Sequence, residues 1–385
     1  MRTAKNQTGV YVHVPFCVAK CGYCSFNSVA LDDRSTLDRY LDAVAAEIKS
    51  RAAELAELEL KTIYFGGGTP SLVTSEQLQS LIELVCAEAA TGDPQEVTIE
   101  ANPATLSAQN LTGFWRVGID RLSIGVQSFN PQALEMLEAT QREGHAVRAY
   151  KMARDAGFEN IGLDLIVGLP EPFEDVFQDD LELVARLAPE HLSVYLLSID
   201  EDANLHRLVE TGDLELLDDD RQAYVFLQAS EALREAGYEH YEVSNFAKPG
   251  YRSQHNSRYW TGESYHGFGA GAHSLLFAGG NWIRRANISD PGSYIAAGPG
   301  KRLIDFEEKL TPGMITREKF MLQLRLVEGI APADFPDIAD QIVVRLSPYT
   351  RAGLFAWDGS RFRPTPAGML MADGIAADLW DLVKD

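Results

Sequence analysis

The sequence is short of cysteine and of long apolar runs. Only four of its 385 residues are cysteine, and a chain of this length can bury a large core without disulfide bonds. No run approaches the roughly 18 uncharged apolar residues of a membrane-spanning helix. The first residues also lack the apolar stretch of a signal peptide. We therefore expect a cytoplasmic protein with no membrane segment of its own.

Basic residues are also scarce, with 34 Lys and Arg against 56 Asp and Glu, for a net charge of −22. Such a surface argues against binding nucleic acid through its phosphates and against docking on anionic lipid. Apolar residues make up 45% of the chain and charged residues 23%, as in ordinary globular proteins. The composition predicts a folded protein that does not bind nucleic acid.

Segments of strand and helix character alternate up to about residue 243. This alternation predicts right-handed βαβ units and a parallel sheet, hence an α/β fold. Six or seven such units in series favour a partial or full (β/α) barrel over a doubly wound sheet, with 238–243 as the last strand. In a barrel, ligands bind at the carboxyl ends of the strands. We expect residues 1–243 to form this barrel domain.

The remainder of the chain has a different character. Residues 244–310 are rich in Gly, Ser, Asn and aromatic residues and show little periodicity, so we expect an irregular segment. Residues 311–385 become helical again, with two short strand-like stretches around Asp358-Gly359. They predict a small C-terminal helical or winged-helix-like domain.

Three of the four cysteines, Cys17, Cys21 and Cys24, lie within eight residues in a C-x3-C-x2-C spacing. Three thiolates can bind three irons of a [4Fe–4S] cluster and leave the fourth iron open to another ligand. A structural zinc site needs four ligands, and no second Cys or His pair follows. Cys86 falls in an amphipathic helical segment, where a small buried thiol is expected. An iron–sulfur site is the prediction, and unligated thiols are the alternative.

The stretch from Tyr11-Val-His-Val-Pro-Phe-Cys17 to Gly22-Tyr23-Cys24 resembles the radical SAM superfamily, in its coproporphyrinogen oxidase-like branch. The resemblance extends over nearly the whole chain. It implies that the open iron chelates S-adenosylmethionine (SAM) and that one electron from the cluster cleaves SAM to a 5′-deoxyadenosyl radical. The cofactors supply this chemistry, and no side chain is assigned a catalytic role.

The same resemblance assigns residues to the cluster and SAM site. The glycine run within Phe65–Pro70 matches the superfamily's SAM-binding glycine motif, where glycine lets the backbone approach a ligand closely. Without the resemblance, this run would be an ordinary strand-ending turn. The matching SAM contacts and cluster-proximal aromatic residues are Tyr11, Tyr23, Gly67, Gly68, Thr69, Glu100, Gln127 and Asp164.

Two features separate the oxidases of this branch from its HemW-type haem chaperones. Phe26 stands where the oxidases carry a further cysteine, and the stretch from His255 and Asn256 to Tyr259 and Trp260 resembles the H-N-x-x-Y-W motif of the chaperones. The resemblance implies that these four residues bind haem, with a histidine for the iron and aromatic faces for the macrocycle. Considered without the family, a loop histidine beside Asn and Arg is more often a structural hydrogen-bonding residue than a ligand.

One position departs from the pattern of the family. Its members usually carry an arginine here, which in the oxidases contacts a second SAM, but this chain has Ala139. A second SAM is therefore not expected, and Arg142 is the nearest substitute. The predicted function is a haem chaperone that carries a [4Fe–4S] cluster and SAM, takes an electron from a donor protein and delivers haem to recipient haemoproteins, respiratory ones included. The alternative is an enzyme that acts on a tetrapyrrole, for example by decarboxylating coproporphyrinogen III. The sequence leaves open whether SAM is cleaved.

Overall fold

The computed structural model describes residues 6–383, and a twelve-stranded sheet lies at their centre. Six parallel strands stand side by side in chain order, without the reversal of a doubly wound sheet. They are β1 (Gln7–Val14), β4 (Glu59–Gly67), β5 (Glu96–Ala101), β6 (Arg121–Gln127), β7 (Asn160–Val167) and β8 (His191–Leu196). This arrangement confirms the predicted parallel α/β barrel.

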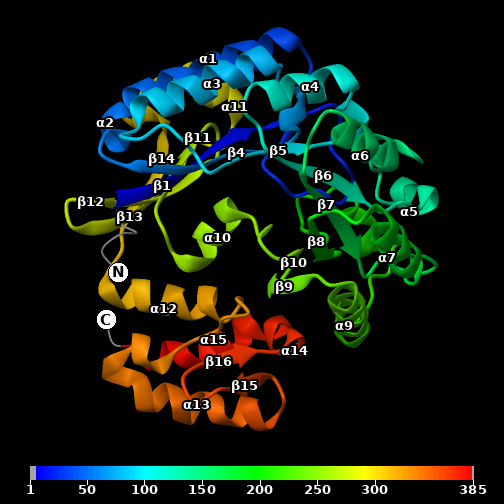
Figure 1. Ribbon diagram of the computed structural model, residues 1–385, viewed down its shortest axis with the longest axis vertical. Coiled ribbons are helices and arrows are strands. Elements are labelled where there is room, and N and C mark those ends of the chain that lie inside the picture. Colours follow the sequence, from blue (N-terminus) through cyan, green and yellow to red (C-terminus); the bar gives the residue numbers. More distant parts are fainter. Residues whose placement is uncertain (1–5, 384–385) are drawn as a thin grey trace.

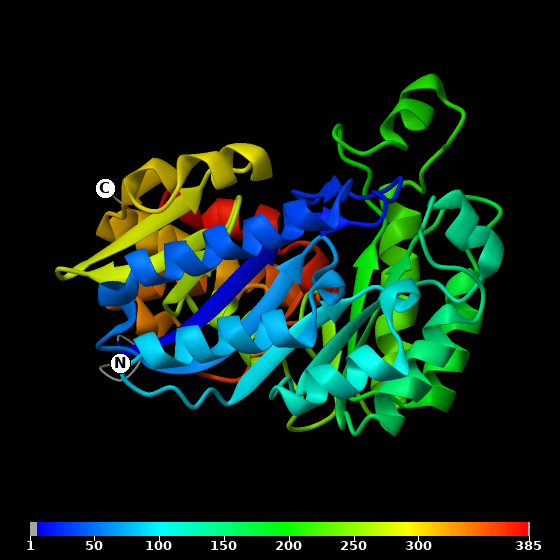
Figure 2. The same cartoon turned by 90° about the horizontal axis from the view of Figure 1, so that it is seen from above.

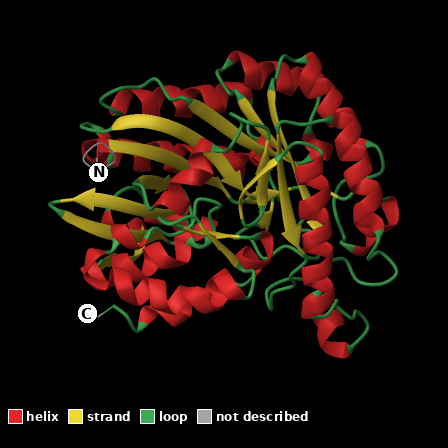
Figure 3. Cartoon of the chain, turned by 60° about the horizontal axis from the view of Figure 1, so that its bottom comes forward, coloured by secondary structure: helices red, strands yellow, loops and turns green. Residues whose placement is uncertain are grey.

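Helices cover the outer face of the curved sheet (Figures 1 and 3). They are α1 (Arg34–Ser50), α2 (Ala52–Leu55), α3 (Ser75–Glu88), α4 (Ala108–Arg116), α5 (Pro131–Met136), α6 (His145–Asp155), α7 (Val176–Leu187) and α9 (Asp219–Glu235). In α1, Leu37, Leu41 and Val44 recur at helical spacing and are buried. One large apolar cluster joins these helices, except α5, to the sheet, and α5 packs in a separate small cluster. The hydrophobic core therefore lies outside the barrel rather than within it.

The inner face of the barrel is polar. Side chains alternate along a strand, and on β4 the inward positions are Thr62, Tyr64 and Gly66. Glu96 and Glu100 take the same face of the neighbouring strand β5, and Tyr64 donates a hydrogen bond to Glu100 across the pair. The barrel interior therefore offers hydrogen-bonding groups along its whole depth.

The sheet continues beyond the barrel on both sides, which corrects two expectations. Strand β9 (Glu239–Glu242), expected to end the parallel series, pairs antiparallel with β10 (Asn245–Ala247), which pairs antiparallel with β8. On the other side, β11 (Tyr265–Phe268) runs parallel to β1, and β12 (His273–Ala278), β13 (Asn281–Asn287) and β14 (Ile304–Lys309) follow antiparallel. The barrel is therefore partial, with open edges at β9 and β14.

Residues 244–310, expected to be irregular, thus contain five strands as well as α10 (Gln254–Thr261) and α11 (Pro291–Ala297). Part of their glycine content makes turns between strands. Gly279 and Gly280 both have positive φ, 56° and 81°, and join β12 to β13 in a two-residue hairpin turn. Glycine-rich sequence here marks tight connections in a sheet.

The C-terminal part has its own apolar core, formed by residues between Phe320 and Val383. It consists of α12 (Pro312–Gln323), α13 (Ala339–Arg351), β15 (Phe355–Trp357), β16 (Phe362–Pro364), α14 (Pro366–Leu370) and α15 (Ala372–Trp380). β15 and β16 pair antiparallel, which confirms the expected two-stranded wing. This unit lies beneath the barrel, with α10 between the sheet and α12 (Figure 1). Within residues 6–383, none of the helices has the length and apolar character needed to cross a bilayer.

Candidate functional site

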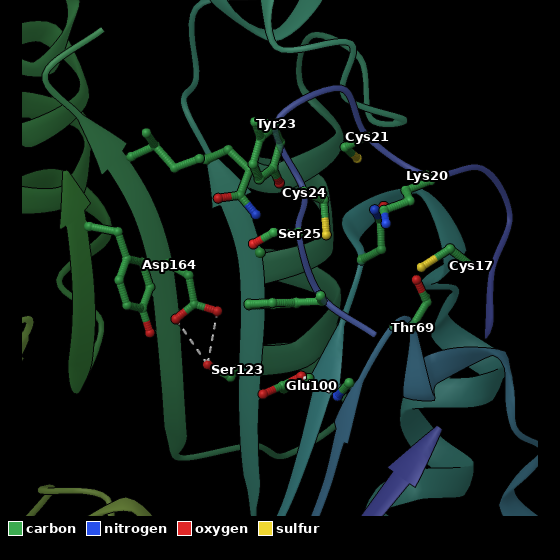
Figure 4. Close-up of a pocket in the computed structure, with 18 of the residues that line it drawn as sticks. Cys17, Lys20, Cys21, Tyr23, Cys24, Ser25, Thr69, Glu100, Ser123 and Asp164 are labelled. Carbon is green, nitrogen blue, oxygen red and sulfur yellow. Dashed lines mark hydrogen bonds between the residues drawn. The ribbon is translucent and has the colours of Figure 1, made fainter. Parts of the chain in front are cut away.

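A cavity of about 550 Å³ opens at the carboxyl ends of the barrel strands. Its walls bring together the three clustered cysteines, the glycine run at the end of β4 and polar residues from β5, β6 and β7 (Figure 4). Residues as far apart in the chain as Cys17 and Ser198 therefore meet at the end of the barrel where ligands bind. Of the residues assigned above to the cluster and SAM, all but Tyr11 line this cavity.

The cysteine loop lies over one side of the cavity. Cys17 ends the two-residue strand β2 (Phe16–Cys17), which pairs with β3 (Val29–Ala30). The Cys24 N–H donates a hydrogen bond to the carbonyl of Cys21, 3.2 Å away. Gly22 joins the loop to its neighbours, since its N–H donates to the Leu137 carbonyl and its carbonyl accepts from the Leu205 N–H. Leu205 precedes α8 (His206–Thr211), which lies in a segment that stands out from the body in green (Figure 2).

The three cysteines fit a [4Fe–4S] cluster better than a single metal ion. All three are free, half-buried thiols on the wall of one cavity. Among residues 6–383, no three His, Cys, Asp or Glu side chains converge as the ligands of one ion would. A four-iron cube instead binds each thiolate at a different iron. Burial raises the pKa of the Cys17 and Cys21 thiols, and binding to iron provides the drive to deprotonate them.

The glycine run brings the end of β4 against the cysteine loop. Gly67 has φ +116°, and a β-carbon there would lie 2.5 Å from the His13 ring. A β-carbon on Gly68 would lie 3.0 Å from the Cys17 sulfur. The Thr69 hydroxyl lies beside that same cysteine and partly offsets the effect of burial on the pKa of its thiol. The run is thus more than a strand-ending turn, because larger residues would separate the strand from the cysteines.

Two carboxyl groups face the cavity from neighbouring parts of the barrel. Glu100 accepts hydrogen bonds from the Tyr64 hydroxyl at 2.7 Å and from the Gly67 N–H at 3.0 Å. Burial, with a further contribution from the negative charge of Asp164, raises the pKa of Glu100 to about 7. Asp164 accepts from the Ser123 hydroxyl with both oxygens, and burial raises its pKa too (Figure 4). Such groups can accept hydrogen bonds from ribose hydroxyls or an ammonium group.

Gln127 and Tyr23 complete the wall. Gln127 has φ +64°, and the register of β6 against β7 shifts just before it, between Gly125 and Gln127. Tyr23 packs beside a small apolar cluster that contains Ala139, which is only 4% exposed. The guanidinium of Arg142 is bound to the carbonyls of Ala139 and Gln141. Among the described residues that line the cavity, Lys20 is the single cation, so no arginine takes the place that Ala139 leaves.

The H-N-x-x-Y-W stretch lies elsewhere, and the expected haem ligand is not available there. His255 is fully buried in α10, near the amino ends of the barrel strands. Its Nδ1 lies 2.7 Å from the Thr62 hydroxyl and its Nε2 lies 2.8 Å from the Tyr259 hydroxyl. Burial lowers the pKa of His255 to about 3, so the ring is neutral. Since both nitrogens are hydrogen-bonded, neither is free for an external iron.

The other residues of this stretch do not assemble a flat binding surface. Tyr259 faces the barrel, where its ring meets Tyr265 edge to face. Trp260 lies under the guanidinium of Arg325, 5.8 Å from its ring centre, toward the C-terminal unit. Asn256 is half-buried in the same helix. His255 and Tyr259 therefore face the barrel together, whereas Trp260 faces the C-terminal unit.

Sequence reasoning missed several residues of this region. Tyr64, Ser123 and Tyr195 hold or line the cavity, and Thr62 and Glu96 hold α10. A usable signal was present, because polar residues at every second position of β4 and β5 predict a polar inner face.

Comparisons with known proteins agree with this architecture. Residues 11–184 match the family model of the radical SAM superfamily, and residues 310–371 match that of the HemN C-terminal domain. The heme chaperone HemW of Escherichia coli strain K12 is 36% identical over 327 residues, which cover 85% of this chain and 84% of that protein. The heme chaperone HemW of Mycobacterium tuberculosis H37Rv is 33% identical over 375 residues, or 96% of this chain and 94% of that protein.

Among solved structures, coproporphyrinogen III oxidase (HemN) from Escherichia coli, described as a radical SAM enzyme, superimposes with a TM-score of 0.81. The superposition covers 99% of this chain and 91% of that one at 22% identity. At this identity the match establishes the shared fold and no shared activity.

Proposed function

This chain belongs to the heme chaperone HemW family within the radical SAM superfamily, and we propose that it binds haem and delivers it to recipient haemoproteins. The observation that carries this proposal is 36% identity with a heme chaperone over 84% of that protein's length. The cysteine-lined cavity supports it, because it contains the residues that a radical SAM protein needs.

As a radical SAM protein, the chain carries a [4Fe–4S] cluster and SAM. We assign the cluster to Cys17, Cys21 and Cys24 and SAM to the cavity beside them. When bound, these cofactors supply one-electron cleavage of the SAM sulfonium. The protein's own part is to hold the cysteines on a loop tied to Leu137 and Leu205, to offer acceptors to SAM from Glu100, and to shield the site from water.

Charge and redox chemistry suggest the remaining partners. With a net charge of −22, the surface favours an electron-donor protein that docks through a basic patch. Cysteines that bind iron must stay reduced, which favours the cytoplasm as the compartment. We include respiratory haemoproteins among the proposed recipients.

Hemin titration of the anaerobically reconstituted protein tests the haem function. We expect saturable binding of one haem per chain, followed by the Soret band, and transfer of that haem to an added apo-haemoprotein such as apomyoglobin. Absorbance that rises with added hemin without saturating, as expected for non-specific adsorption, would contradict the proposal.

Assays for the alternative use the same preparation. The resemblance to the oxidases places Phe26 at the position of their additional cysteine and Ala139 at that of their arginine, and neither side chain can replace those groups. We therefore expect no SAM-dependent decarboxylation of coproporphyrinogen III. Formation of the decarboxylated product in proportion to SAM consumed would replace the chaperone assignment by an enzymatic one.

A further inference from the structure

Helix α10 is inserted into the amino end of the barrel, below the SAM cavity. A β-carbon on Gly9 of β1 would lie 3.1 Å from the His255 ring and 3.1 Å from the Arg258 side chain, so the helix lies directly on the strand. Thr62 on β4 contacts the same histidine through its hydroxyl. Thr62 lies in the first half of β4, whose last residue, Gly67, lines the cavity.

A buried carboxylate holds this helix in place. Glu96, at the start of β5, is 3% exposed. Its two oxygens accept the backbone N–H groups of Gln254 and His255, each at 3.0 Å. These N–H groups belong to the first turn of α10, where helical partners are missing and negative charge is favoured. Glu96 therefore fixes both the position and the direction of the helix.

The His255 ring in turn supports two tyrosines that lie above it. Its centre is 5.0 Å from the Tyr64 ring and 6.4 Å from the Tyr11 ring, and those two tyrosine rings stack 6.0 Å apart. Tyr64 donates to Glu100 on the cavity wall. Tyr11 bonds to His13, whose other nitrogen meets the carbonyl of Asn27 beyond the cysteine loop.

The packing leaves these groups little freedom. A β-carbon on Gly66 would lie 2.9 Å from the rings of both Tyr11 and Tyr64 and 3.1 Å from Glu100. A shift of the His255 ring therefore displaces the tyrosines, because close-packed side chains transmit displacement. The carboxylate of Glu100, which Tyr64 holds, lies at the end of this series of contacts.

We propose that helix α10 is an internal support of the SAM site and that His255 is a positioning residue, which acts through Tyr64 and Tyr11 to fix the carboxylate of Glu100. The H-N-x-x-Y-W stretch then serves SAM binding, and haem binds at a surface apart from it. The inference rests on the proposed function only in placing SAM in the cavity. It assigns no chemical step to the histidine.

The test compares SAM and hemin binding in full-length, anaerobically reconstituted variants with equal iron content. His255→Leu fills the space but forms no hydrogen bonds, and His255→Gln offers an amide to Thr62 and Tyr259. Gln254→Ala, an exposed position of the same helix, is the matched control. SAM affinity is read from the SAM-induced change in the electron paramagnetic resonance spectrum of the reduced cluster, and hemin affinity from the Soret band.

We expect His255→Leu to weaken SAM binding about tenfold, the effect of about one hydrogen bond to a charged group, with hemin affinity within about twofold of wild type. His255→Gln should recover part of the loss, and Gln254→Ala should match wild type. A shifted Soret band and weaker hemin binding in His255→Leu, with SAM binding unchanged, would overturn the proposal and restore His255 as a haem ligand. Unchanged binding of both ligands would also overturn it.

A second variant keeps the test decisive if His255→Leu does not fold. Tyr64→Phe retains the ring and removes only the hydroxyl that reaches Glu100, so its SAM affinity should also fall about tenfold. Wild-type SAM affinity in Tyr64→Phe would refute the series of contacts. If wild-type protein binds SAM but not hemin, the haem function fails while this inference is still tested.

Discussion

Glu96 and Glu100 lie on the same face of β5, four residues apart, and act at opposite ends of the barrel interior. Glu96 accepts the first N–H groups of α10, and Glu100 lines the cavity beside the cysteine loop. Both carboxyls are enclosed by protein, but only Glu96 is bound by two backbone donors of a helix. We therefore expect substitutions of Glu100 to affect SAM binding and substitutions of Glu96 to affect stability.

Binding of SAM should depend on pH through Glu100. Burial raises the pKa of this carboxyl from 4.5 to about 7, so it is largely neutral below that pH and ionised above it. The ionised form is the better acceptor for the hydroxyl and ammonium donors of SAM. We expect the affinity for SAM, measured by titration of the reconstituted protein, to increase as the pH rises through about 7.

Glu100→Gln is the matched control, since its amide does not titrate in this range. The variant should bind SAM more weakly and without the pH dependence around 7. The stability of the protein without SAM should change with pH in the opposite direction, falling as the pH rises. The folded pKa is raised, so the stabilisation linked to protonated Glu100 is present below pH 4.5 and lost as the pH rises through about 7. A pH profile of SAM binding that Glu100→Gln leaves intact would assign the titration to another group.

Glu96 should matter mainly for stability. Glu96→Ala leaves two buried N–H groups without an acceptor at the start of α10, which should lower the free energy of unfolding by about 2–4 kcal/mol. Glu96→Gln retains one acceptor and should cost about half as much. Denaturant unfolding measures the difference, with the exposed Glu57→Gln as control. Equal stability of Glu96→Ala and wild type would show that α10 does not depend on this carboxylate.

Cluster binding should divide the four cysteines into two groups. Cys17, Cys21 and Cys24 line the cavity, whereas Cys86 packs against the core from α3. Each of the three Ser variants should lose most of its iron and sulfide after reconstitution, because a [4Fe–4S] cluster held by two thiolates is poorly retained. Cys86→Ser should keep wild-type iron content. Analysis of iron and sulfide in each variant measures cluster content. Loss of iron from Cys86→Ser would contradict the assignment of the cluster to Cys17, Cys21 and Cys24.

The strand series and the cluster cysteines could be predicted because their signals are local. The alternation of helix and strand up to 243 predicts parallel strands in chain order, and the carboxyl ends of those strands contain Gly67, Glu100 and Gln127. The spacing of the cysteines is likewise contained in eight residues. For these features, short windows of sequence determine the arrangement.

The role of α10 could not be predicted in this way. The hydrogen bond of His255 to Thr62 joins residues 193 positions apart, and no local pattern indicates which strand a helix will meet. Tyr64 and Glu96 were missed for a related reason. A polar side chain within an apolar segment weakens the prediction of a strand. Its role becomes clear only when its partner on the inner face of the barrel is known.

Gly67 offers a test of how closely β4 must approach the cysteine loop. Gly67→Ala places a methyl group 2.5 Å from the His13 ring at φ +116°, so it combines a clash with backbone strain of about 1–3 kcal/mol. Gly118→Ala is the matched control, because the exposed Gly118 has φ +91° and no neighbouring atom within 4 Å of the added carbon. The control should lose only the stability due to strain and keep wild-type affinity for SAM. Gly67→Ala should lose more stability, and it should also weaken SAM binding about tenfold or more, because moving the Gly67 N–H removes one of the two hydrogen bonds to Glu100. If the two variants bind SAM equally well, the close approach at Gly67 is not what positions the carboxylate.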